Sequence, residues 1–101
     1  SPKYTNRLLK EKPMKLEIAD KSVEIKQAKA KHILVIEQKL NKPISKIGSD
    51  PSFSDLFIIF TVAVTASDAT ITDDWLEENV GFELMPKMAE VIQAFLEVPQ
   101  S

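Results

Sequence analysis

The sequence predicts a mostly α-helical fold, a small domain of about four helices with a short N-terminal β-hairpin; the alternative is an all-α domain. Three observations lead to this prediction. The chain has 101 residues, enough for one modest hydrophobic core. Apolar residues make up 44% and charged residues 28%, as in ordinary globular proteins. Beyond residue 27, apolar residues recur mainly at helical spacing. We expect residues 14–101 to form this single domain, and residues 1–13 to be a flexible basic tail or a remnant introduced by cloning.

The predicted hairpin comes from two short runs, MKLEI and VEIK, in which apolar and polar residues alternate. Alternation with a period of two is typical of β-strands. The polar residues 19–22 between the runs predict a turn, although it lacks the Asn-Gly or Asp-Gly that hairpins favour. Two strands alone are only marginally stable in water, so the hairpin is expected to lie on an apolar surface.

The pattern becomes helical from about Gln27 to Leu40. One stripe along this segment is largely apolar, and the lysines fall mostly outside it. The stripe consists of Ala28, His32, Val35, Ile36 and Leu40. The helix is expected to end at Asn41-Lys42-Pro43, because the residue before a proline is pushed out of the α-helical region.

A very apolar helix is expected from about residue 50 to Ala66. Its start is expected at Asp50 as N-cap with Pro51 in the first helical position; an alternative start is Ser52, with Asp55 three residues on. Residues 56–60, LFIIF, are apolar on every side of such a helix. A helix of this kind is either central in the core or shared with another chain. The longest apolar stretch, from Leu56 to Ala66, is interrupted by Thr61 and Thr65. It has about half of the ~20 residues that a bilayer-spanning helix needs, so no membrane partner is expected.

Two further helices are predicted toward the C-terminus. Thr72 or Asp73 is expected to cap a short acidic helix over residues 74–79, and Gly81 to interrupt the chain after it. The last helix is expected over about residues 83–98. Its apolar stripe consists of Leu84, Met88, Val91, Ile92, Phe95 and Leu96.

The composition argues against most catalytic chemistry. The chain has no cysteine, one histidine and two glycines. These counts exclude a disulfide framework, a thiolate or multi-histidine metal site within one chain, and a glycine-rich phosphate loop. His32 lies on the apolar stripe without a positioned partner, which indicates a core or boundary histidine rather than a catalytic one. The acidic group Asp73, Asp74, Glu77 and Glu78 lacks the spacing of a calcium loop. We therefore predict a protein that is not an enzyme and has no catalytic residue, cofactor or metal.

Charge is distributed very unevenly along the chain. Residues 1–49 hold 12 basic and 5 acidic residues, a net charge of +7, whereas residues 50–101 hold 1 lysine and 10 acidic residues, a net charge of −9. This split suggests a partner surface or copies that stack basic face on acidic face; the alternative is that each helix simply has a solvated charged face. Nucleic-acid binding is a weaker hypothesis, because Tyr4 is the one aromatic residue of the basic half.

The order of these parts resembles a known family. The sequence runs from the hairpin MKLEIADKSVEIK through a basic helix, a loop and an apolar helix, to an acidic WLEENVG turn and a final helix ending IQAFLE. This layout is similar to the tail assembly chaperones of long-tailed bacteriophages, small helix-rich proteins that coat the apolar, helical tape measure protein before the tail tube forms. The resemblance covers about residues 14–98. It implies a chaperone that acts in the host cytoplasm during phage assembly and is absent from the mature virion.

These observations give two sets of candidate interaction residues. Binding of an apolar client helix in a groove is expected to use Phe53, Leu56, Phe57, Phe60, Val64 and Phe95. Head-to-tail self-assembly into a ring or spiral is expected to use Lys29, Lys31, Glu77 and Glu78. The alternatives are an oligomeric structural or adaptor protein of a phage particle, and a nucleic-acid-binding protein with a basic arm.

Overall fold

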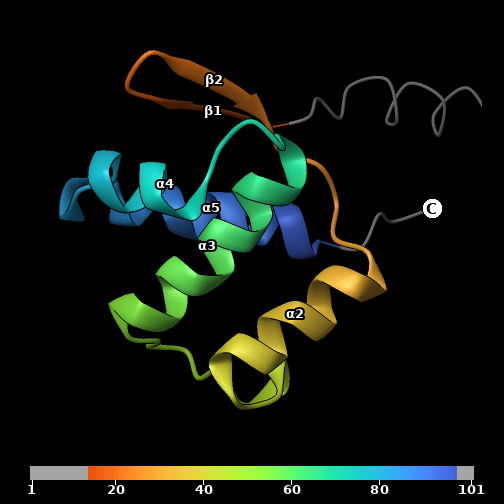
Figure 1. The fold of residues 1–101 in the computed structure, drawn as a ribbon. Coiled ribbons are helices and arrows are strands. Elements are labelled where there is room, and N and C mark those ends of the chain that lie inside the picture. Colours follow the sequence, from red (N-terminus) through yellow and green to blue (C-terminus); the bar gives the residue numbers. More distant parts are fainter. Residues whose placement is uncertain (1–13, 98–101) are drawn as a thin grey trace, which may run out of the picture.

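The computed structural model describes residues 14–97 (Figure 1). Within this range lie an antiparallel hairpin and four α-helices, which confirms the predicted mostly-α fold with an N-terminal hairpin. The elements are β1 (Lys15–Ile18), β2 (Lys21–Glu24), α2 (Ala30–Leu40), α3 (Phe53–Ser67), α4 (Asp73–Asn79) and α5 (Met85–Leu96), with 3₁₀ turns η1 (Ile44–Lys46) and η2 (Phe82–Leu84). The predictions for residues 1–13 and for Val98 lie outside the described residues.

The hairpin packs one apolar face on the helices. Leu16 lies opposite Val23 in the strand register, and the side chains of both are buried with those of Ile18 and Ile25. The turn is tighter than the expected four residues, because β2 already begins at Lys21. Figure 1 shows the hairpin lying over one end of the helical layer. The alternation in the sequence therefore separates a core face from a solvent face, as predicted.

Helix α2 begins at Ala30, three residues later than the sequence pattern suggests. The backbone N–H of Ala28 donates to the carbonyl oxygen of Phe95 at 2.8 Å, and the side-chain amide of Gln27 donates to the carbonyl oxygen of Glu97. Residues 27 and 28 are thus held outside the helix, against the end of α5. These tertiary hydrogen bonds keep residues 27 and 28 out of the helix, although their sequence pattern is compatible with a helical turn.

The start of α3 is at the second of the two predicted positions. The Ser52 hydroxyl accepts the backbone N–H of Asp55 at 3.1 Å, which makes Ser52 the N-cap. The preferred start at Asp50 and Pro51 is wrong, and the alternative start at Ser52 is confirmed. The Asp55 carboxylate instead accepts a hydrogen bond from the Lys42 ammonium at 2.7 Å, which ties the end of α2 to the start of α3.

Helix α3 is the centre of the core. It packs most extensively against α5 and then against α2, and Figure 1 shows it crossing the middle of the domain. The six residues from Ile59 to Val64 are all buried, as expected for a helix that is apolar on every side. None of the helices within residues 14–97 has the length and apolar character needed to cross a membrane.

The connection from α3 to α5 depends on short polar caps. Thr70 donates to the Asp68 carboxylate from its backbone N–H at 2.9 Å and from its hydroxyl at 2.6 Å, which closes the turn after α3. Thr72 then caps α4 by accepting the N–H of Trp75 at 3.1 Å, so Thr72 rather than Asp73 is the N-cap. Pro86 lies in the first turn of α5, where its missing N–H costs no hydrogen bond.

Candidate functional site

A row of four phenylalanine rings, here called the aromatic ladder, leads from the core to the surface. Phe53 and Phe57 are one turn apart on α3, with ring centroids 5.9 Å apart and planes 14° apart. Phe57 continues the row inward to Phe60 at 6.3 Å, and Phe53 continues it outward to Phe82 at 5.7 Å. These separations are those of favourable aromatic pairs.

Exposure rises along the ladder. Phe60 is completely buried, Phe53 and Phe57 are half-buried, and Phe82 is 71% exposed. Leu56, which lies beside Phe57 on the first turns of α3, is also half-buried. A large aromatic side chain so open to water, and backed by further apolar rings, is typical of a surface that contacts a partner.

Three of the six predicted client-binding residues are not available at this surface, which corrects the predicted set. Phe60, Val64 and Phe95 have no exposed area, because α5 packs along α3 and encloses them. They are core residues of the folded chain. The structure leaves Phe53, Leu56 and Phe57 at the surface and groups them at the start of α3.

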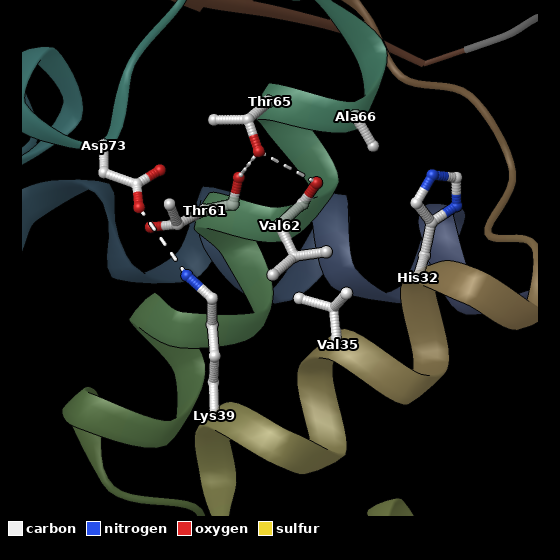
Figure 2. A pocket seen from close by; sticks show the side chains of 8 residues that line it. All are labelled: His32, Val35, Lys39, Thr61, Val62, Thr65, Ala66 and Asp73. Carbon is white, nitrogen blue, oxygen red and sulfur yellow. Dashed lines mark hydrogen bonds and ion pairs between the residues drawn. The ribbon is translucent and has the colours of Figure 1, made fainter.

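A cleft of about 240 Å³ lies between α2 and α3. Figure 2 shows its lining from both helices, with His32 toward one end and the Lys39–Asp73 ion pair toward the other. The apolar part of its wall is formed by Val35, Val62 and Ala66. Thr61 and Thr65 supply its remaining polar atoms.

The polar groups of the cleft differ in whether they have a hydrogen-bond or ion-pair partner. The Thr65 hydroxyl donates to the carbonyl oxygen of Thr61 at 2.8 Å, within α3. The Thr61 hydroxyl is buried and has no hydrogen-bond partner among the described residues. Lys39 and Asp73 form an ion pair at 3.7 Å whose side chains are about half exposed, so it is a weak link. Thr61 lines the same cleft as this pair (Figure 2).

His32 forms a structural contact at the other end of the cleft. Its Nδ1 accepts the backbone N–H of Lys29 at 2.9 Å, and its ring lies 5.5 Å from that of Phe95. Burial lowers the pKa of His32 below its ordinary value, and the positive charges of Lys31 and Lys29 lower it further. The neutral imidazole is therefore favoured, in agreement with a boundary histidine.

The four residues predicted for charge-driven self-assembly are all exposed. Lys29 and Lys31 lie at the start of α2, and Glu77 and Glu78 lie in the second half of α4. None of the four takes part in an ion pair within residues 14–97. Two other ion pairs, Lys39–Asp73 and Lys42–Asp55, already join the basic and acidic halves inside one chain.

Residues 14–97 contain no group of three or more histidine or acidic side chains placed to hold a metal ion. The acidic residues of α4 are exposed and lie around the outside of a short helix.

Sequence reasoning missed two exposed apolar residues, Phe82 and Leu34, which are 71% and 67% exposed. Both fall outside the helical stripes of their segments. The exposure of Phe82 could have been suspected from the sequence, because this aromatic residue directly follows Gly81 and belongs to no amphipathic stripe.

No protein-family model, no curated protein and no solved structure matches the chain.

Proposed function

We propose that this chain is a non-enzymatic chaperone of bacteriophage tail assembly. In this proposal it binds apolar helical segments of the tape measure protein in the host cytoplasm and assembles head-to-tail around them. It leaves before the virion matures. The layout of its elements, which resembles that family, supplies the identity of the client.

The observation that carries the proposal is the open end of the aromatic ladder. Phe53, Leu56 and Phe57, on the first turns of α3, are only half-buried. Burying apolar surface stabilises a contact by about 25 cal/mol per Å², so an open aromatic surface favours an apolar partner. The backing by Phe60 and the core holds these rings in place before a partner arrives, which lowers the entropy lost on binding.

The spacing of the surface residues suits a helical client. Phe53, Leu56 and Phe57 lie at i, i+3 and i+4 on α3, so they share one side of its first turns. Phe82 borders the same surface through its contact with Phe53. A client helix with apolar residues at the same spacing could lay its apolar stripe along this surface.

The test is co-expression with an aggregation-prone apolar helix taken from a tape measure protein, followed by measurement of the soluble client. We expect the wild-type chain to raise client solubility and the Phe53→Ala, Leu56→Ala double variant to raise it less. Leu34→Ala is the matched control, since Leu34 is an exposed apolar residue on α2, outside this surface. Client solubility that is unchanged by the wild-type chain would contradict the proposal.

A structural or adaptor protein is the alternative that the same experiment separates. Such a protein would self-associate without keeping the client soluble. Salt-sensitive retention of the chain on DNA or RNA would instead favour the nucleic-acid-binding alternative.

A further inference from the structure

We propose that Phe82 of one copy inserts into the α2–α3 cleft of the next copy. This inference rests on the head-to-tail assembly included in the proposed function and names the contact that would produce it. The occupant of the cleft is thus a second copy of this chain.

The cleft has the size and lining that a phenyl ring requires. Its volume is about 240 Å³, and Val35, Val62 and Ala66 give it an apolar wall. A dry apolar cavity of about 150 Å³ is enough to bind benzene. A single aromatic side chain therefore fits the cleft, whereas a whole helix does not.

Phe82 has the properties of the inserted group. It is the most exposed of the large apolar residues in the described chain and lies on the short η2 turn between α4 and α5. One side of its ring is supported by Phe53 at 5.7 Å. A supported ring loses little conformational freedom on insertion, which favours binding.

Charge favours the second copy as occupant. Phe82 is followed by Glu83, whose carboxylate folds back against Gly81, and is preceded by the acidic helix α4. The cleft is bordered on α2 by Lys39, and Lys31 is adjacent to the lining residue His32. The acidic group at the rim, Asp73, is already held by Lys39. An acidic segment carrying Phe82 thus meets a mainly basic rim.

The two surfaces lie at different places on the chain. Phe82 packs on the first turn of α3, whereas the cleft uses Thr61 and later residues of that helix. Residues 53 and 61 are about 12 Å apart along the helix axis. A contact between two different patches is heterologous, so it propagates into a ring or an open spiral rather than a two-fold dimer.

The test uses two variants that each lack one side of the contact. Phe82→Ala removes the inserted ring, and Val35→Trp fills the cleft from its partly exposed α2 wall. By sedimentation equilibrium each variant alone should self-associate at least about tenfold more weakly than the wild type. Mixed together, they should form a 1:1 dimer and stop there, because only one productive contact remains.

Matched controls keep the experiment decisive. Leu34→Ala removes a similarly exposed apolar side chain outside the cleft and should assemble like the wild type. Circular dichroism checks the fold of each variant, and Ala66→Leu replaces Val35→Trp if the latter unfolds. The inference is overturned if the mixture stays monomeric, if Phe82→Ala assembles normally, or if the wild type forms a monomer or a closed two-fold dimer.

Failure of this contact and failure of the chaperone proposal give different results. If the two variants complement each other but the client remains insoluble, the chaperone proposal is refuted and the Phe82 contact is kept. If the wild-type chain keeps the client soluble but does not assemble through Phe82, the Phe82 contact is refuted and the chaperone proposal is kept.

Discussion

His32 caps its own helix by accepting the backbone N–H of Lys29 through Nδ1 at 2.9 Å. Lys29 is the N-cap of α2 and His32 is three residues further on, the place where glutamate or glutamine stands in a capping box. The imidazole satisfies one of the N–H groups that a helix start leaves unpaired. Only the neutral ring can accept this hydrogen bond, so protonation of Nδ1 breaks the cap.

This cap predicts a loss of stability on mild acidification. The pKa of His32 is lowered in the folded chain from 6.5, by burial and by Lys31 and Lys29, so the unfolded chain binds more protons just below pH 6.5. The stabilisation is complete above about pH 6.5 and is lost as the pH falls through the folded-state pKa. Urea unfolding at pH 7.5 and pH 5 should show a lower free energy of unfolding at pH 5.

His32→Gln is the control for this prediction. Glutamine retains an acceptor for the Lys29 N–H but does not titrate, so the difference between pH 7.5 and pH 5 should shrink in this variant. The pKa of Asp68 is lowered from 3.8, mainly by hydrogen bonding to Thr70, so its effect falls below this pH window. An equal pH dependence in both proteins would rule out His32 as its source.

Thr61 predicts a stabilising substitution in the cleft. Its hydroxyl is buried without a hydrogen-bond partner among the described residues, an arrangement that costs about 1–3 kcal/mol. Thr61→Val removes the hydroxyl and keeps the branched shape, so the free energy of unfolding should rise by about 1 kcal/mol. Thr65→Val is the comparison, because the Thr65 hydroxyl already bonds the carbonyl oxygen of Thr61. Thermal unfolding that ranks Thr65→Val above Thr61→Val would contradict this explanation.

The regular elements of this fold could be predicted because their signals are local. The alternation around Leu16 and Val23 places both side chains in the core, and the hydroxyls of Ser52 and Thr72 cap the helices that follow them. The start of α2 could not be predicted, because Ala28 bonds the carbonyl oxygen of Phe95, far away in the sequence.

The place of the hairpin turn was predicted, but its tight, left-handed backbone conformation was not. Ala19 adopts φ 53°, a left-handed conformation that usually selects glycine or asparagine. Burial of the apolar hairpin face outweighs this local cost, so the strands form without the favoured turn sequence.

The candidate site was predicted only in part, for a physical reason. The apolar residues of α3 predict a helix that is buried or shared with another chain. A single sequence does not show which sides of this helix are covered by other helices. Val64 and Phe60 are covered by the domain itself, whereas Phe53 remains near water. Phe82 lies outside every apolar stripe of the sequence. Only the structure shows that its ring packs on Phe53 and so joins the aromatic ladder.

The division between core and surface phenylalanines predicts two very different stability effects. Phe60→Ala should lower the free energy of unfolding by about 3–5 kcal/mol, because it leaves a cavity beside α3 at a completely buried position. Phe82→Ala should change it by less than about 1 kcal/mol, since most of that ring is already in water. Chemical denaturation of the dilute, unassembled chain measures both values. Comparable losses would mean that Phe82 belongs to the core rather than to an interaction surface.

Reversal of charge tests the proposed stacking of basic on acidic faces. Lys29→Glu with Lys31→Glu should weaken self-association, and adding Glu77→Lys with Glu78→Lys should partly restore it, because each surface pair contributes about 0–1 kcal/mol. The reversals suit the helix dipoles, since glutamate enters the start of α2 and lysine the end of α4, so the fold should be retained. Sedimentation velocity at pH 7.5 in low and high salt measures the effect. If the fourfold variant associates no better than the Lys29, Lys31 double variant, the C-terminal half of α4 is not the surface that meets α2.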